Sequence, residues 1–143
     1  MTVRHILEAK GREVSTIEPG ISIGEAAALL CKRKIGALVV IGEGAKVLGI
    51  LSERDVVRLV VGEGAEGLTK PVSDRMTSDV VVGRDDMTLD EAMGLMTKGR
   101  FRHLPICEGG RLVGIISIGD AVKRRLEEVE EEAKNLRSYI HAG

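Results

Sequence analysis

The sequence predicts an α/β fold of the α+β kind, in which one β-α-β-β-α unit occurs twice. The first observation is an internal repeat: the segment that begins at Val14 aligns with the segment from Val80, and, after the loss of one residue, the segment from Val47 aligns with that from Leu112. The second observation is size, because a unit this small buries too little core to be stable alone. We therefore expect the two copies to pack sheet to sheet.

The repeat is supported by identical or similar residues at many ordered positions. Between the copies, residues 62–71 are rich in glycine and end in proline, which is typical of a linker. We expect the first repeat and its lead-in to occupy residues 1–66, and the second repeat with an extended C-terminal helix to occupy residues 67–143. The clearest matches pair Ser22 with Thr88, Glu25 with Glu91, Ala26 with Ala92, Leu29 with Leu95, Gly49 with Gly114, Ile50 with Ile115, Ser52 with Ser117 and Asp55 with Asp120.

Three short strands are expected in each copy. A run rich in β-branched residues opens the unit, and two further apolar runs are separated by a glycine-containing turn, the pattern of a β-hairpin. The expected strands cover residues 14–17, 37–41 and 47–51 in the first copy and residues 80–82, 103–107 and 112–116 in the second.

The first helix of each copy has a well-marked start. Ser22 with Glu25, and Thr88 with Glu91, form S/T-x-x-E capping boxes, in which the hydroxyl accepts from a free amide of the first helical turn. Apolar residues then recur at helical spacing in both copies. The predicted order of elements within each unit is therefore strand, helix, two strands and a second helix.

Composition and charge exclude several classes of partner. The formal net charge is −1, and Phe101 and Tyr139 are the only aromatic residues, so no nucleic-acid partner is expected. No run reaches the ~18 apolar residues of a membrane span, and the N-terminus lacks a signal-peptide core. Cys31 and Cys107 fit no CxxC pattern and lie in apolar contexts, which predicts buried thiols in a reducing compartment, the cytoplasm.

The sequence also argues against an enzyme. It contains no P-loop or Rossmann glycine pattern and no cluster with metal-ligand spacing. Ser117, His103 and Asp120 carry the residue types of a catalytic triad, but no G-x-S-x-G elbow surrounds the serine. We expect no catalytic residue, no metal and no catalytic cofactor.

The strongest local motif is a doubled G-I-[LI]-S-x-x-D, which ends a buried strand and opens a helix. It covers residues 49–55 and 114–120. One interpretation is purely structural, with the serine as N-cap and the aspartate three residues on as its capping-box partner. The other is a ribose-phosphate clamp, because a helix N-terminus attracts phosphate and a carboxylate one turn further accepts from ribose hydroxyls. The spacing fits both.

The whole pattern resembles the paired CBS domain, or Bateman module, over roughly residues 3–133. This resemblance implies two repeats related by pseudo-twofold symmetry, with two clefts between them that bind AMP, ADP or ATP, and in some members NAD or S-adenosylmethionine. The family aspartate that holds the ribose matches Asp55 and Asp120, and the hydroxyl that contacts phosphate matches Ser52 and Ser117. Gly119 belongs to the second motif and Arg54 to the first. The family base-binding positions match Thr16, Gly36 and Ala37 for the cleft of Asp120, and Val82, Arg102, His103 and Pro105 for the cleft of Asp55.

The two copies differ at these positions. Arg102 and His103 replace the small pair Gly36 and Ala37, and the hydroxyl of Thr16 has no counterpart in the second copy. Small residues leave room for a base, whereas arginine and histidine offer donors to a phosphate. We therefore expect two unequal clefts, with the Asp120 cleft binding AMP-like ligands better and with Arg102 and His103 at its phosphate.

The C-terminal helix carries a heptad-type apolar stripe about 27 Å long. The stripe either packs on its own module or contacts a second subunit, and because Bateman modules pair into discs we expect a homodimer to which this helix contributes. The stripe consists of Val122, Leu126, Val129, Ala133, Leu136 and Ile140.

The expected function is a stand-alone regulatory module that senses an adenine nucleotide and acts on an unidentified protein target. Two alternatives remain open. One is an NAD(H) sensor, because NAD also presents an adenosine and a phosphate to the clamp. The other is a structural dimerisation or adaptor protein without a ligand, because Ser52, Asp55, Ser117 and Asp120 also cap helices.

Overall fold

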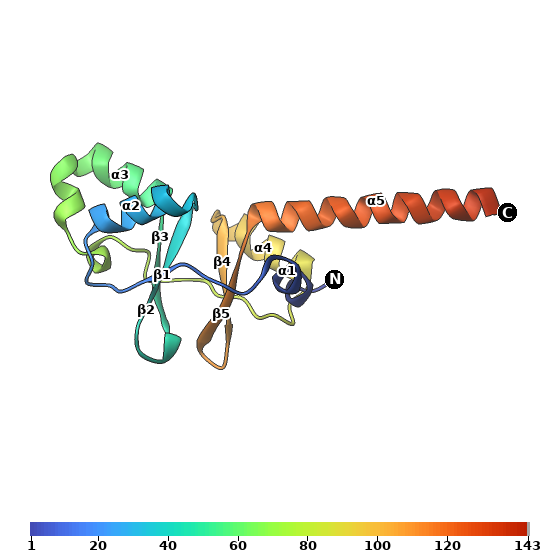
Figure 1. Cartoon of the computed structure of the whole chain (residues 1–143), viewed down its shortest axis with the longest axis horizontal. Coiled ribbons are helices and arrows are strands. Elements are labelled where there is room, and N and C mark those ends of the chain that lie inside the picture. Colours follow the sequence, from blue (N-terminus) through green and yellow to red (C-terminus); the bar gives the residue numbers. More distant parts are fainter. Residues whose placement is uncertain (143) are drawn as a thin grey trace.

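Two small sheets lie side by side at the centre of the molecule, with helices at either end (Figure 1). The computed structural model describes residues 1–142. One sheet has three strands in the order β1-β2-β3, and the other pairs β4 with β5. The elements are α1 (Val3–Lys10), β1 (Thr16–Ile17), α2 (Ile23–Arg33), β2 (Ala37–Ile41), β3 (Val47–Ser52), α3 (Glu53–Glu63), α4 (Leu89–Gly99), β4 (His103–Glu108), β5 (Arg111–Ser117) and α5 (Ile118–Ala142), with short 3₁₀ turns η1 (Glu43–Ala45), η2 (Ala65–Thr69) and η3 (Val72–Asp74).

The two halves repeat the same details of backbone structure. Both hairpins are antiparallel, and each has a register shift near its turn, between Val40 and Ile41 in one and between Ile106 and Cys107 in the other. The first amide of α3 donates to the Gly36 carbonyl oxygen, and the first amide of α5 donates to that of Arg102. The predicted duplicated α/β architecture and the long C-terminal helix are confirmed.

The expected starts of the first helices are confirmed by their caps. The Ser22 hydroxyl accepts from the Glu25 amide at 3.1 Å, and the Thr88 hydroxyl accepts from the Glu91 amide at the same distance. These bonds satisfy amides that have no partner inside the helix. The polar spacing in the sequence therefore located both helices correctly.

The predicted opening strand of the second copy, residues 80–82, is wrong. In the first copy the Val39 amide donates to the Ser15 carbonyl oxygen and joins β1 to β2 in parallel. The residue that matches Val39 is Pro105, which has no amide hydrogen to donate. Pairing is reduced to one bridge further along, between Gly83 and Ile106.

The segments that lead into each repeat are exchanged between the two halves. Helix α1, which the sequence analysis did not predict, places Val3, Ile6 and Leu7 in the core of the second repeat. In return, Val72 belongs to the core of the first repeat, where Met76 packs beside it. The two repeats are thus joined by packed side chains as well as by the linker.

The expectation that both cysteine thiols are buried is wrong. Cys31 is exposed and Cys107 is partly exposed, and both are free thiols.

In the part of the chain that the structure describes, no helix has the length and apolar character needed to cross a membrane.

The position of α1 gives a direct test of this exchange. Leu7 is fully buried, so Leu7→Ala removes core contacts of the second repeat and is expected to lower the free energy of unfolding by about 2–5 kcal/mol. Urea denaturation followed by circular dichroism measures the change. Glu8→Ala, on the exposed face of the same helix, is the matched control and should stay within about 0.5 kcal/mol of the parent. An equally small effect of Leu7→Ala would remove α1 from the core.

Candidate functional site

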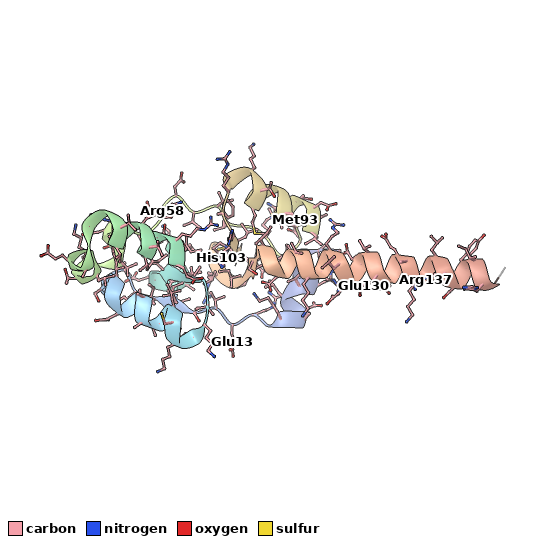
Figure 2. All side chains as sticks on the ribbon, turned by 90° about the horizontal axis from the view of Figure 1, so that it is seen from above. Glu13, Arg58, Met93, His103, Glu130 and Arg137 are labelled. Atoms are coloured by element: carbon pink, nitrogen blue, oxygen red, sulfur yellow. The ribbon has the colours of Figure 1, made fainter. Side chains whose placement is uncertain are left out.

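A cavity of about 640 Å³ lies between the two halves of the molecule. Its volume is within the range of small-molecule sites. The first half supplies the junction between β3 and α3, and the second half supplies the segment around Val80 and the start of β4. Figure 2 shows His103, one of its lining residues, between the two halves.

Ser52 and Asp55 stand at the strand-to-helix junction on one wall of this cavity. Each caps the other: the Asp55 amide donates to Ser52 Oγ at 3.3 Å, and the Ser52 amide donates to Asp55 Oδ2 at 2.8 Å. The Ser52 hydroxyl also lies 3.0 Å from the same carboxylate oxygen. Within residues 1–142, no hydrogen bond to Oδ1 of Asp55 accompanies these, so capping engages one oxygen of the carboxylate and leaves the other without a hydrogen bond.

Four arginines give the cavity its positive charge, against three carboxylates. The ion pairs that arginines make within residues 1–142 involve Arg4, Arg12, Arg75, Arg84, Arg124 and Arg125, so none of the four is neutralised in this way. Unpaired guanidinium groups beside a helix N-terminus favour an anionic ligand. The four are Arg54, Arg58, Arg100 and Arg102.

Arg100 is held at the cavity in an unusual backbone conformation. It ends α4 with a φ of 57°, in the left-handed region where glycine is the usual residue, and Lys34 ends α2 in the same way with a φ of 54°. A non-glycine residue in this conformation carries strain that tends to persist at functional sites. Each repeat therefore ends its first helix with a cationic side chain at a position where glycine would be less strained.

The imidazole of His103 fills the space that Gly36 leaves open across the junction. A Cβ atom at Gly36 would lie 3.1 Å from the imidazole Nε2 and 3.0 Å from a Glu53 carboxylate oxygen. Burial lowers the pKa of His103; Lys10 and Arg102 act in the same direction, whereas Glu53 and Asp120 oppose it. The side chain is therefore neutral at pH 7.

The second junction, at Ser117 and Asp120, has the same cap but an additional partner. The Ser117 amide donates to Asp120 Oδ2 at 2.8 Å, and the Asp120 amide donates to Ser117 Oγ at 3.1 Å. The Lys10 ammonium lies 2.7 Å from the same carboxylate oxygen and also donates to the Ile115 carbonyl at 3.0 Å. Burial alone would raise the pKa of Asp120, but Lys10 and the Ser117 cap outweigh it and lower the pKa.

The structure brings together part of the site that the sequence suggested. Gly36, Ser52, Arg54, Asp55, Arg102, His103 and Ser117 line the cavity. Arg102 and His103 were matched to base-binding positions of the Asp55 cleft and also placed at the phosphate of the Asp120 cleft; both lie in the cavity that contains Asp55. The remaining suggested residues are outside the lining of this cavity: Thr16 in β1, Ala37 in β2, Val82 in the irregular segment, Pro105 buried in β4, and Gly119 and Asp120 in the first turn of α5.

Several cavity residues were missed. Arg58 lies one helical turn beyond Asp55, a spacing that is visible in the sequence. Thr77 could be placed only by tertiary structure, because its amide and carbonyl pair with those of Ile50 at the edge of β3. The other lining residues not named from the sequence as ligand contacts are Ile50, Glu53, Asp79, Val80, Val81, Gly99, Arg100, Phe101 and Ile118.

Comparison with known proteins identifies the family. The CBS domain model matches residues 3–62 and 72–127, so the chain belongs to the CBS domain family as a tandem pair. The CBS domain-containing protein YhcV of Bacillus subtilis is 37% identical over 129 residues, with 90% of each chain covered. The crystal structure of the CBS-domain protein ATU1752 from Agrobacterium tumefaciens is 52% identical, has a TM-score of 0.84, and is matched over 87% of this chain and 99% of that one.

Two other solved CBS pairs are ligand complexes. The structure of CBSX2 in complex with AMP is 27% identical, with a TM-score of 0.78, and covers 88% of this chain and 97% of that one. The CBS pair of MJ0100, in complex with 5′-methylthioadenosine and S-adenosyl-L-methionine, is 26% identical with a TM-score of 0.77, over 90% and 97% of the two chains. Related CBS pairs therefore bind ligands that contain adenosine.

The environment of His103 makes stability depend on pH. Its pKa is lowered in the folded state from ~6.5 in the unfolded chain, so the unfolded chain binds the proton more tightly. The free energy of unfolding is therefore highest, as far as His103 is concerned, above pH ~6.5, and it falls as the pH drops below that value. We expect His103→Gln to flatten the fall in unfolding free energy between pH 7.5 and 5.5, measured by urea titration. His141→Gln, on the exposed end of α5, should keep the parent slope; an unchanged slope in His103→Gln would contradict this assignment.

Proposed function

We propose that this chain is a regulatory CBS pair that binds an adenine nucleotide, of the AMP, ADP or ATP type, in the cavity beside Asp55. The observation that carries the proposal is the combination of a cavity of about 640 Å³ with the Asp55 carboxylate, which has one oxygen without a hydrogen bond, and four arginines without an ion pair within residues 1–142. The AMP complex of CBSX2 supports the ligand class. The proposal gives the chain no catalytic residue and no catalytic cofactor.

The chemistry of the lining divides the cavity into three parts. The free oxygen of Asp55 suits the two ribose hydroxyls, because a carboxylate accepts from both. Ile50, Val80 and Val81 provide an apolar wall for the base. The N-terminus of α3, Arg58 and the other arginines provide positive charge for the phosphate, by helix dipole and by guanidinium donors.

Regulation follows from the position of this cavity between the two repeats. A ligand held by groups from both halves stabilises the arrangement of the halves to which it binds best. The size of the shift equals the difference in binding free energy between that arrangement and the others. That change of population is the signal that a protein target would read. A cytoplasmic location, a homodimer and an unidentified target are parts of the same proposal.

The nucleotide could bind beside Asp55 or beside Asp120, and the two sites differ in their contacts. The sequence favours the Asp120 cleft, and that preference stays a prediction. We favour the Asp55 cavity because the Lys10 ammonium already occupies a hydrogen-bonding position on the Asp120 carboxylate. Oδ1 accepts no hydrogen bond in either carboxylate within residues 1–142, but a nucleotide at Asp120 would meet a charge that Lys10 already balances, whereas Asp55 takes part in no ion pair within the same residues.

An adaptor protein without a ligand is the second candidate. The observation in its favour is that both serine-aspartate pairs form complete capping boxes, which explains those residues by helix stability alone. It does not explain the four unpaired arginines in one cavity.

A thermal-shift panel separates the two candidates. A ligand that binds only the folded state raises the melting temperature. At a ligand concentration one hundred times the Kd, it adds about 2.7 kcal/mol to the free energy of unfolding. We expect at least one of AMP, ADP and ATP to raise Tm at millimolar concentration. NAD, NADH and S-adenosylmethionine complete the panel, and a larger shift with NAD or NADH would favour the dinucleotide alternative. Absence of any shift would favour the adaptor.

Two matched variants identify the cleft. Asp55→Asn keeps an oxygen that can cap Ser52 but loses one acceptor and the charge, so we expect AMP affinity to fall about tenfold by calorimetry. Asp120→Asn is the equivalent change at the other junction and should alter affinity less than about twofold. The reverse order of effects would place the nucleotide at Asp120, where the sequence analysis put it. Unchanged affinity in both variants would reject the carboxylate clamp.

A further inference from the structure

Helix α5 presents an apolar stripe with no partner in the described part of the chain. The helix runs out beyond the rest of the molecule (Figure 1). The large apolar side chains of the stripe are exposed by 45–64%, and a hollow of about 520 Å³ lies along the helix between Ile118 and Glu130. The exposed members of the stripe are Val122, Leu126, Val129, Leu136 and Ile140.

The stripe does not face the body of the protein. Ala121 is buried and faces the second repeat, and Val122 is one residue further, which rotates it by about 100° around the helix axis. Val129 lies about 80° from Ala121 by the same count. A second helix can therefore lie against the stripe while the body of each chain stays to the side.

The spacing along the stripe is that of a coiled coil. Alternating steps of four and three residues assign Leu126, Ala133 and Ile140 to a positions, and Val122, Val129 and Leu136 to d positions. Position e then holds Lys123, Glu130 and Arg137, and position g holds Arg125, Glu132 and Tyr139. In a coiled coil the e and g residues select the orientation of the partner.

These flanking charges match a second copy of this helix in one orientation. In a parallel pair in register, a g residue faces the e residue of the next heptad on the other helix. Arg125 then faces Glu130 of the second copy, and Glu132 faces Arg137 of the second copy. In a fully overlapping antiparallel pair, Glu130 and Glu132 each face their own equivalents, and Lys123 faces Arg137, so like charges meet.

Three of these four charged residues are free to make such contacts. Glu130, Glu132 and Arg137 take part in no ion pair within residues 1–142, whereas Arg125 already pairs with Glu128 at 3.2 Å and with Asp90. Figure 2 shows Arg137 on the part of α5 that lies far from the body. The charge pattern is therefore explained by a partner helix better than by contacts within the chain.

We propose that α5 pairs with α5 of a second copy as a parallel, in-register, two-stranded coiled coil from Val122 to Ile140. The apolar seam supplies the association, and the Glu132 and Arg137 pairs set its direction. This inference does not rest on nucleotide binding, because no residue of the stripe lines the cavity.

Disulfide trapping in the full chain tests the orientation. With Cys31→Ser and Cys107→Ser as background, Leu136→Cys places two thiols opposite each other only in the parallel register, within the Cα separation that a disulfide needs. We expect it to form a covalent dimer at least about tenfold faster than Ser138→Cys, the control on the outer face. Equal rates for the two variants would overturn the proposal. Cross-linking of Leu136→Cys to Leu126→Cys, in preference to itself, would show an antiparallel pair and would also overturn it.

A charge exchange provides the second test. Glu132→Arg and Arg137→Glu each place like charges together in the parallel pair, so each should raise the dimer dissociation constant several-fold by sedimentation equilibrium, and the double variant should restore it. Arg137→Glu alone would strengthen an antiparallel dimer, because it would then face Lys123, and that result would reject the proposal. Circular dichroism confirms that each variant stays folded, as expected because Arg137 lies on the exposed end of α5.

Discussion

The reciprocal cap at the end of each hairpin is the interaction on which the site depends. Ser52 and Asp55 satisfy each other's backbone amides where β3 becomes α3, and this contact fixes both the start of the helix and the direction of the carboxylate. A cap of this kind contributes about 0.5–2 kcal/mol. Because it uses one carboxylate oxygen, the other stays available, and the structural and binding interpretations of the motif are compatible.

The duplication makes two equivalent junctions, and long-range contacts make them different. Lys10, at the end of α1, forms an ion pair with Asp120, while the matching segment of the other half runs through Thr77 and pairs by its backbone with Ile50. Pro105 removes one hydrogen bond from the second sheet and leaves the segment around Val80 irregular, where it lines the cavity. The two junctions therefore differ in their contacts although their motifs match.

The cavity and the C-terminal helix are mechanically connected. Ile118 lines the cavity and is also the first residue of α5, so the wall of the proposed site continues directly into the helix that carries the apolar stripe. A nucleotide that shifts the two halves would move this helix with the second repeat. If α5 pairs with α5 of a second copy as proposed, a change in the arrangement of the halves in one chain would be transmitted to the other chain through the paired helices.

Much of the architecture follows from the sequence, because it is encoded by local patterns. The hydroxyl and carboxyl spacing located the starts of α2, α3, α4 and α5, and the alternation of apolar runs with glycine turns located both hairpins. The duplicated motif also identified Ser52 and Asp55. Local hydrogen bonds and side-chain periodicity depend on residues a few positions apart, and a single sequence displays them fully.

Tertiary structure decided what those local elements meet. No local pattern indicated that α1 would join the core of the second repeat, that Lys10 would reach Asp120, or that His103 would fill the space beside Gly36. The effect of Pro105 was also hidden, because a missing amide matters only when a carbonyl from another segment lies opposite. These contacts join residues far apart in the chain, and their partners are set by how the two repeats pack, which sequence periodicity does not record.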